Sequence, residues 1–433
     1  MNLKCKHSCE KCRYEVSFAL LLIIVSSPYV LSVRFESSTH ASKNTFLKGS
    51  PPNNITDLVV PFGYPLEQHV LTTEDGYVLT LYRIPSSGTH KSGNNPAGNK
   101  PAVLLSHGLL DSCACFLLLG PGRALAFMLA DQGFDVWLGN ARGSTHSRNH
   151  TRLNTSSPLF WAFSFDEMAK YDLPAQLDKI VEVTGHTQVS FVGHSQGTTV
   201  LLAALASQPH LNDKIKMAIL MAPVVFTQKI SSIPFLTLAS LGTDQIFTMM
   251  GVNEFLPSDK VVALLEGSLC YMQPALCLNI LSAIAGFSQD NVDPDRLPSY
   301  LKYTPAGTSV QNIAHWSQAV RQALPRTLYS FDYGSDCRVM RDGVTMCNWV
   351  RYGRPDPPAY DLGAVRSPIM LVTGGRDRLS DAVEVEYLRE SLAAGVVFQE
   401  LHIERYEHLD FTWGRDVADT VYRQVLEVLF QQT

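Results

Sequence analysis

Charge is scarce in this 433-residue chain, because only 17% of the residues are charged whereas 45% are hydrophobic. A chain of this length and composition can bury a large core. The net charge is −5, and Lys and Arg are scattered without a basic patch, which argues against nucleic acid as a partner. The sequence also lacks internal repeats, a glycine-rich phosphate loop and a nucleotide-binding fingerprint, so we expect no cofactor.

Metal-ligand patterns are scarce as well. His146 and His150 are four residues apart, but they stand beside Arg142 and Arg148. No cysteine or carboxylate cluster completes a ligand set around them. We therefore interpret this stretch as a solvated loop and expect no metal site.

What the sequence does contain is a strand, a tight turn and a helix around one serine. The apolar run Val189-Ser190-Phe191-Val192 leads into Gly193-His194-Ser195-Gln196-Gly197, and a helix-forming stretch follows at 198–204. A serine hydroxyl becomes an effective nucleophile when it is held exposed on such a turn, within reach of a base. Ser195 is therefore the candidate nucleophile. The pattern predicts an α/β-hydrolase fold: a mostly parallel central sheet, flanking helices and an inserted, mainly helical cap.

In this fold the acid and the base follow the nucleophile, each in a loop after a late strand. Residues 368–373 predict a buried strand that ends in Gly374-Gly375-Arg376-Asp377. Asp377 is the candidate acid and Asp381 is the alternative. Either aspartate could instead cap the helix that we expect to begin near Ala382.

The candidate bases in this region are two histidines. His402 alternates with apolar residues in a strand-like segment, whereas His408 lies in a loop before the last helical pattern. We therefore predict that His408 takes the proton of Ser195 and that Asp377 fixes its tautomer.

Stabilisation of a tetrahedral intermediate needs two backbone N–H donors. One is expected from Gln196, directly after the nucleophile. The other is expected from Leu109, because the predicted strand Ala102-Val103-Leu104-Leu105 runs into the loop that contains it. His107 in the same loop is interpreted as a residue that shapes the loop.

Longer strings accompany these residues: Gly63-Tyr64-Pro65-Leu66-Glu67-Gln68-His69, Asp75-Gly76-Tyr77, His107-Gly108-Leu109-Leu110, Gly139-Asn140-Ala141-Arg142-Gly143, residues 163–175, residues 306–312 with His315-Trp316, and His408-Leu409-Asp410-Phe411. Through them the chain, from about Val59 onward, resembles the acid lipases, the family of gastric lipase and lysosomal acid lipase. The resemblance implies an acid-tolerant enzyme of the secretory or endolysosomal route that hydrolyses triacylglycerols or cholesteryl esters. It also implies the same triad.

The chain departs from the family pattern in two places. Leu379-Ser380-Asp381-Ala382 stands where Leu-Ala-Asp-Pro is usual, close to the candidate acid. Cys113, Cys115 and Phe116 replace the usual serine and tryptophan positions near Leu109. The second departure bears on the acyl pocket.

The N-terminus and the cysteines indicate export. Four basic residues precede an uncharged run at 16–33, which is typical of a signal peptide or, alternatively, of an uncleaved type II signal anchor. The six cysteines beyond residue 12 are even in number, and local spacing suggests pairing Cys270 with Cys277 and Cys337 with Cys347. Three glycosylation sequons begin at Asn54, Asn149 and Asn154.

We divide the chain into a signal segment (1–33), a flexible leader (34–57), a first core part (58–223), a cap with a lid (224–350) and a second core part (351–433). Residues 267–287 carry no charge. They are either a buried helical hairpin or a mobile lid whose apolar underside makes transient contact with a lipid surface.

The sequence therefore predicts a lipase of the secretory pathway, secreted or lysosomal or vacuolar, that acts on neutral lipid esters at a lipid–water interface. A short-chain carboxylesterase or an acyltransferase is the alternative within enzymes. A lipid-binding protein without turnover is the alternative outside them. The sequence leaves the oligomeric state open.

Overall fold

The computed structural model describes residues 54–87, 100–240, 252–256, 286–288, 290–322, 326–338, 340–341 and 343–431. The predicted signal segment, most of the predicted leader and lid, and the predicted Cys270–Cys277 pair lie outside these residues. Ile55 is fully buried, and the first described helix begins at Thr56, before residue 58 where we placed the start of the core.

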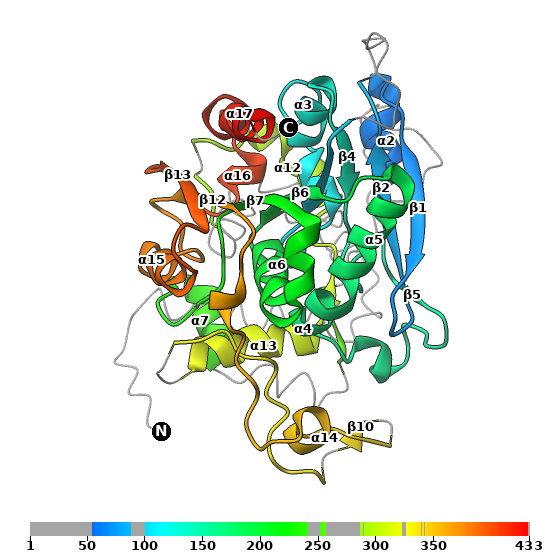
Figure 1. The fold of residues 1–433 in the computed structure, drawn as a ribbon, viewed down its shortest axis with the longest axis vertical. Coiled ribbons are helices and arrows are strands. Elements are labelled where there is room, and N and C mark those ends of the chain that lie inside the picture. Colours follow the sequence, from blue (N-terminus) through cyan, green and yellow to red (C-terminus); the bar gives the residue numbers. More distant parts are fainter. Residues whose placement is uncertain are drawn as a thin grey trace, which may run out of the picture.

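The centre of the described part of the chain is a nine-stranded sheet in the order β1-β2-β4-β3-β6-β7-β12-β13, with β5 paired to β2 (Figure 1). Its strands are β1 (Glu67–Thr72), β2 (Tyr77–Ile84), β3 (Ala102–Ser106), β4 (Asp135–Leu138), β5 (Asn149–His150), β6 (Val189–His194), β7 (Ile215–Met221), β12 (Ile369–Gly374) and β13 (Val397–Ile403). From β4 to β13 every neighbouring pair is parallel, whereas β1, β2 and β5 pair antiparallel. The predicted mostly parallel sheet is confirmed.

Helices cover both faces of the sheet, which explains why its central strands are apolar throughout. On one face α5 and α6 pack with Leu104 and Phe191, and on the other α3 and α17 pack with Val103 and Val192. The α-helices are α2 (Thr56–Val59), α3 (Leu125–Asp131), α4 (Phe165–Glu167), α5 (Leu173–Thr184), α6 (Gln196–Ser207), α7 (Ile233–Ser240), α12 (Leu297–Leu301), α13 (Val310–Arg321), α14 (Asn348–Tyr352), α15 (Ala382–Ser391), α16 (Asp410–Trp413) and α17 (Arg423–Gln431).

Short helical turns of other types link these elements. Two π-helical turns, η6 (Met168–Asp172) and η10 (Ala418–Tyr422), run directly into α5 and α17. The 3₁₀ turns are η2 (Val60–Phe62), η4 (Cys113–Phe116), η5 (Pro158–Trp161), η7 (Pro209–Lys214), η8 (Pro294–Arg296) and η9 (Leu362–Ala364).

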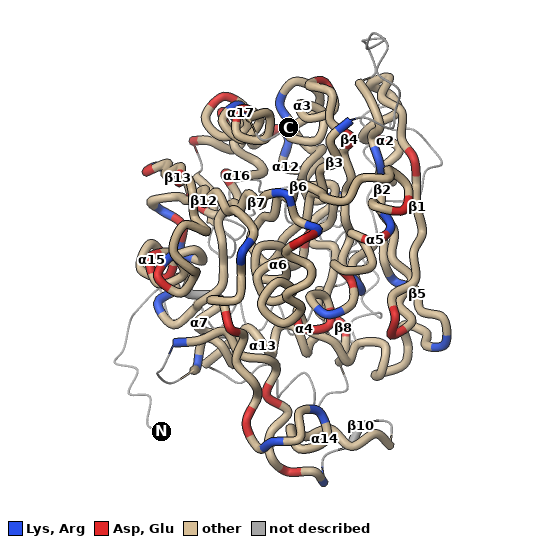
Figure 2. The backbone as a smooth tube through the Cα atoms, in the orientation of Figure 1, with Lys and Arg blue, Asp and Glu red and all other residues tan. Residues whose placement is uncertain are grey.

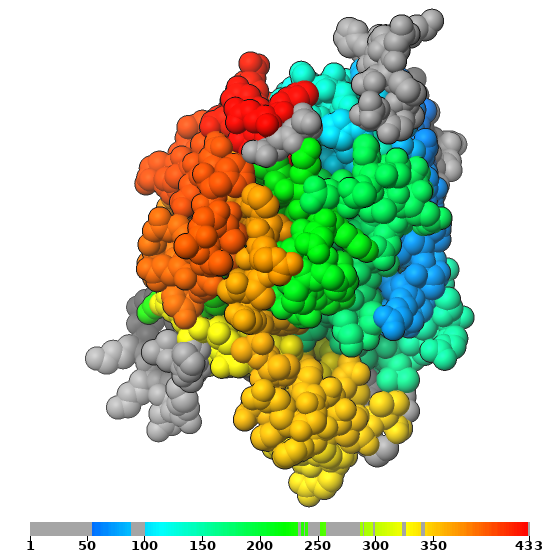
Figure 3. Space-filling view, viewed as in Figure 1, coloured from blue at the N-terminus to red at the C-terminus, as the bar shows by residue number. Residues whose placement is uncertain are grey.

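A long insertion, residues 222–368, separates β7 from β12 and holds α7, α12, α13 and α14. In its described part, β8 (Glu254–Phe255) pairs with β9 (Thr308–Ser309), and β10 (Met340–Arg341) pairs with β11 (Val344–Thr345). In Figures 1 and 3 the part around α14 and β10 stands out from the body of the molecule. A disulfide joins Cys337 to Cys347 there, which is the pairing expected from the sequence. Cys113 and Cys115 are free and buried.

The loop after β4 is a buried anchor rather than a solvated loop. Arg142 is buried and forms ion pairs with Asp75 at 2.6 Å and Asp172 at 2.7 Å. The interpretation of this stretch as a solvated loop is therefore wrong. His150 is buried with a ring nitrogen 3.0 Å from the Asp75 carbonyl, and burial lowers the pKa of His146 to about 4. Through Arg142, the segment 139–143 therefore links the turn between β1 and β2 to the helical segment that contains Asp172.

Figure 2 shows Lys and Arg interspersed with Asp and Glu over the described backbone. Within the described ranges, no group of three or more His, Cys, Asp or Glu residues is placed to hold a metal ion. The helices of those ranges are also too short or too polar for any of them to cross a membrane.

Candidate active site

The serine turn predicted from the sequence lies between β6 and α6. Strand β6 ends at His194 and α6 begins at Gln196, which leaves Ser195 at φ 54° and ψ −124°. A non-glycine residue in this conformation is strained and persists only where its surroundings hold it. A Cβ on Gly197 would lie 2.5 Å from the carbonyl oxygen of Ser106, so the helix can approach β3 closely only with glycine there.

Ser195, His408 and Asp377 lie in one hydrogen-bonded row. His408 Nε2 is 2.7 Å from the Ser195 hydroxyl oxygen, and His408 Nδ1 is 2.8 Å from Asp377 Oδ2. All three side chains are buried, with exposed fractions of 8%, 3% and 5% in that order. They come from three separate elements: the turn before α6, the loop after β13 and the loop after β12.

The loop after β12 holds the carboxylate of Asp377 in place. Its Oδ1 accepts hydrogen bonds from the backbone N–H groups of Leu379 at 2.9 Å and Ser380 at 2.8 Å. Burial alone would raise the pKa of Asp377, but the charge of His408 and these hydrogen bonds outweigh burial and hold it below the usual value. Asp377 is therefore an anionic partner for the imidazole.

The alternative candidates have other positions. Asp381 is the N-cap of α15, where its side chain accepts from the N–H of Val383, as its capping interpretation predicted. His402 lies on β13 with 49% of its side chain exposed and contacts Thr373 and Glu404. Neither side chain takes part in the row that contains Ser195.

His194 contacts the backbone of His408, the candidate base. Its Nε2 is 3.0 Å from the carbonyl oxygen of His408, and the two rings are 5.0 Å apart. Burial, followed by the nearby charge of His408, lowers the pKa of His194 to about 3. A neutral His194 donates its Nε2–H to that carbonyl and adds no charge beside the base.

The loop after β3 packs directly on Ser195, the candidate nucleophile. A Cβ on Gly108 would lie 2.9 Å from the Cβ of Ser195. His107 Nδ1 is 2.8 Å from the carbonyl oxygen of Gly108, and its Nε2 accepts from the N–H of Ala141 at 3.1 Å. Burial lowers the pKa of His107 to about 4, so a neutral ring links this loop to the one after β4, as its loop-shaping interpretation requires.

A cavity of about 160 Å³ opens beside Ser195. Leu109, Gln196 and His408 line it together with mainly apolar side chains. One wall residue, Asp111, is a buried carboxyl group that accepts from the hydroxyl of Thr304 at 2.9 Å, and burial raises its pKa to about 6. Asp111 was not among the residues predicted from the sequence, although a lone charge after His107-Gly108-Leu109-Leu110 was a visible signal.

The comparisons with known proteins agree with this geometry. The protein-family model of the partial alpha/beta-hydrolase lipase region matches residues 55–120. The protein-family model of the alpha/beta hydrolase fold matches residues 101–414. Human lysosomal acid lipase/cholesteryl ester hydrolase is 38% identical over 378 residues, which cover 87% of this chain and 90% of that protein. Human gastric triacylglycerol lipase is 38% identical over 414 residues, 95% of this chain and 98% of that protein.

The chain belongs to the acid lipase family. Mouse lipase member K is similar to the same extent, 38% identical over 87% of this chain and 90% of its own. The resemblance stated from the motifs is therefore confirmed over most of the chain.

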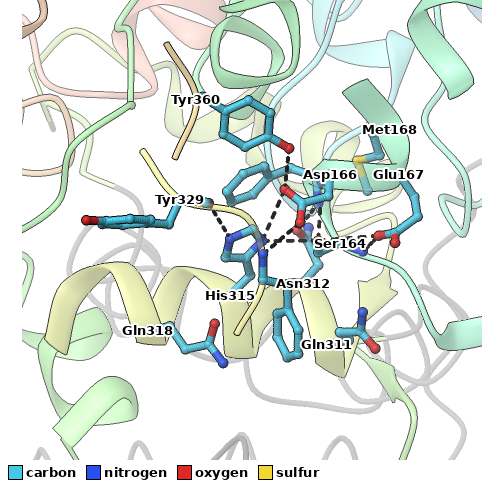
Figure 4. A network of polar contacts seen from close by, with 12 residues as sticks. Ser164, Asp166, Glu167, Met168, Gln311, Asn312, His315, Gln318, Tyr329 and Tyr360 are labelled. Carbon is cyan, nitrogen blue, oxygen red and sulfur yellow. Dashed lines mark hydrogen bonds and ion pairs between the residues drawn. The ribbon is translucent and has the colours of Figure 1, made fainter. Parts of the chain in front are cut away.

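A second serine, histidine and aspartate cluster lies nearby, and sequence reasoning had assigned it no function. His315 Nδ1 on α13 is 3.0 Å from the hydroxyl oxygen of Ser164 and 3.9 Å from Asp166 (Figure 4). Ser164 is fully buried, and its side chain caps α4 by accepting from the N–H of Asp166. His315 Nε2 meets the carbonyl oxygen of Tyr329 at 3.0 Å. These contacts join α13 of the insertion to α4 of the core. The side chains of Ser164, Asp166 and His315 are all engaged in hydrogen bonds within the protein.

Proposed function

We propose that Ser195, His408 and Asp377 form the catalytic triad of a lipase that hydrolyses acyl esters of neutral lipids. The observation that carries the proposal is the row in which His408 lies 2.7 Å from the Ser195 hydroxyl oxygen and 2.8 Å from the Asp377 carboxylate. This is hydrogen-bonding range for a base that accepts the hydroxyl proton and for an acid that orients the base.

In the first half-reaction His408 Nε2 accepts the Ser195 proton while Oγ attacks the ester carbonyl carbon. The carbonyl oxygen becomes an oxyanion, which the backbone N–H groups of Gln196 and Leu109 stabilise. Asp377 stabilises the imidazolium. When the intermediate collapses, the carbon–oxygen bond to the alcohol breaks, and His408 Nε2–H gives its proton to the leaving alcohol.

In the second half-reaction water replaces the alcohol. His408 accepts a proton from water, whose oxygen attacks the acyl carbon bound to Ser195. Collapse of this second intermediate returns the proton to Ser195 Oγ and releases the fatty acid. Every proton movement passes through the one nitrogen that faces Ser195.

The substrate class is supported by the cavity and by the relatives. The wall of the cavity is mainly apolar, as an acyl chain requires. The human relatives are named as a cholesteryl ester hydrolase and a triacylglycerol lipase. We therefore propose triacylglycerols and cholesteryl esters as substrates, met at a lipid–water interface through the predicted lid. We place the protein in the secretory pathway, either secreted or in a lysosome or vacuole, with glycosylation at Asn54, Asn149 and Asn154.

The test is fatty-acid release from emulsified triolein and from cholesteryl oleate at about pH 5 and about pH 8. We expect turnover of at least one lipid by the parent. Ser195→Ala should lower kcat by about 10³-fold or more, because the nucleophile is removed. Ser207→Ala, at the far end of α6, is the matched control and should keep the parent rate.

Four results would contradict the proposal in different ways. Ser195→Ala that hydrolyses at the parent rate excludes the triad. Turnover of a soluble short ester with none of either lipid indicates a carboxylesterase, and preferred transfer to an added alcohol indicates an acyltransferase. Tight binding of the lipid esters without release of fatty acid indicates a lipid-binding protein.

A further inference from the structure

The side chain that follows the nucleophile is held by the insertion. Gln196 is 4% exposed, and its Oε1 accepts hydrogen bonds from Asn312 Nδ2 at 2.9 Å and from Trp316 Nε1 at 2.7 Å. Both donors lie on α13, one turn apart. Because an amide oxygen has two lone pairs, a single helix fills both acceptor positions of this side chain.

Helix α13 is itself fixed to the core. Asn312 is fully buried, and its Oδ1 accepts from the N–H of Phe165 at 3.0 Å, at the start of α4. One turn on, His315 contacts Ser164 as described above, and its ring stacks on Phe165 with ring centres 3.8 Å apart. Figure 4 shows these α13 side chains directed toward α4. The two donors to Gln196 therefore stand on a rigid support.

The position of Gln196 matters because its peptide N–H follows a strained residue. Ser195 holds φ at 54° immediately before α6, and such a conformation needs neighbours that fix it. The peptide between Ser195 and Gln196 carries the N–H that faces the developing oxyanion in the proposed reaction. A donor of this kind stabilises the transition state only if its direction is set in advance.

We propose that Asn312 and Trp316 are positioning residues of the oxyanion hole: by gripping the Gln196 side chain from α13, they set the direction of the Gln196 peptide N–H. This inference rests on the proposed function, because it requires the Gln196 N–H to contact the oxyanion. It also makes the insertion part of the catalytic apparatus in addition to any covering role.

The first test is Trp316→Phe, which removes the indole N–H and keeps an aromatic ring in the cavity wall. We expect kcat for a soluble short-chain ester to fall about tenfold or more, while KM stays within about twofold, because transition-state stabilisation is lost and ground-state binding is kept. Asn312→Asp is the second variant. It keeps the acceptor for the Phe165 N–H but turns the donor to Gln196 into a carboxylate oxygen, and we expect the same pattern.

The matched control is Trp161→Phe. Trp161 is also buried and donates its indole N–H to the carbonyl oxygen of Thr155 at 2.8 Å, away from Gln196. We expect kcat and KM of Trp161→Phe to stay near the parent values. Circular dichroism and melting temperature report whether each variant is folded.

Two further measurements separate positioning from a purely structural role. In a double-mutant cycle, Gln196→Met combined with Trp316→Phe should lower kcat no further than Gln196→Met alone. Either change by itself already removes the hydrogen bond between Trp316 and Gln196. Inhibition by an alkyl trifluoromethyl ketone, whose serine adduct carries an oxyanion, should weaken in Trp316→Phe by the same factor as kcat. Binding of an ether analogue that forms no adduct should not change.

Two results would overturn the inference, because they would show that Trp316 is only a wall of the cavity. One is a double variant in which the losses in kcat of the two single variants multiply. The other is a Trp316→Phe variant with raised KM and unchanged kcat. These outcomes differ from failure of the proposed function, which appears as full activity in Ser195→Ala. If Ser195→Ala is inactive and the cycle is multiplicative, the triad stands and the positioning role is wrong.

Discussion

Asp111 is a carboxyl group in the wall of the cavity beside Ser195, and its burial decides how it titrates. Its Oδ1 accepts from the N–H of Ser112 at 2.8 Å and from the hydroxyl of Thr304 at 2.9 Å, yet burial still raises its pKa to about 6. Folding therefore shifts the titration of Asp111 toward the neutral acid, relative to the unfolded chain. The sequence showed the charge but could not show that the chain would bury it.

Asp111→Asn keeps the shape of this side chain and removes its titration. The folded-state pKa of Asp111, about 6, lies above its ordinary value of 3.8, so the folded protein binds the proton more tightly than the unfolded chain does. This contribution to stability is complete below the ordinary value and is lost as the pH rises through the folded value. We expect the melting temperature of Asp111→Asn, relative to the parent, to be higher at about pH 7.5 than at about pH 5.

Asp356→Asn, at an exposed position of the insertion, is the control and should show the same difference from the parent at both pH values. A difference for Asp111→Asn that does not vary with pH would contradict the account of its burial.

At the scale of elements, the turn between β6 and α6 was predictable because its residues leave few alternatives. A β-branched run, two glycines around a serine and a helix-forming stretch indicate the same structure. Strand β6 extends two residues beyond the predicted run, and α6 begins two residues before and ends three residues after the predicted stretch. The loop after β12 was predictable for a similar reason, since a buried parallel strand has a distinctive apolar run. Strand β13 is largely exposed or half-buried, and the loop after it was predicted from the strand-like alternation of His402 with apolar residues. Contacts of α13 were not predictable, because its polar side chains find partners 116 and 120 residues away in the sequence.

Gly197→Ala tests how tightly α6 and the loop after β3 are fitted together. Its Cβ would lie 2.5 Å from the carbonyl oxygen of Ser106 and 2.9 Å from that of His107, and backbone atoms cannot turn away as side chains do. We expect the free energy of unfolding to fall by about 1–3 kcal/mol in urea titrations and kcat to fall with it, because the shift displaces Ser195 and Leu109 together.

Gly363→Ala is the matched control. The nearest atom to its Cβ is Oδ1 of the Asp361 side chain at 3.1 Å, at an exposed site. Unfolding midpoints that are equal for Gly197→Ala and the parent would contradict the close fit.

The whole molecule combines a predictable core with an insertion that sequence reasoning covers less well. The sheet, the flanking helices and the three candidate catalytic residues follow from local patterns and chain order, and the sheet and helices appear where they were expected. The described part of the insertion lacks the regular alternation of strands and helices that the core has. Its contacts therefore depend on residues of the core that are distant in the sequence. Its described part joins the core through α13 at Ser164, Phe165 and Gln196. Described residues of the insertion, among them Leu256, Leu301 and Trp316, also line the cavity beside Ser195.

The most direct test of the central claim, that Ser195 is the activated nucleophile, is mass-spectrometric mapping of the serine labelled by a fluorophosphonate. Such a reagent transfers its phosphonyl group to an activated serine and releases fluoride. We predict one label per chain, on the peptide that contains Ser195, with hydrolysis lost in proportion to labelling. Labelling should be absent in Ser195→Ala and much slower in Asp377→Asn. A label on Ser164 or any other serine, or hydrolysis that persists after complete labelling, would contradict the account.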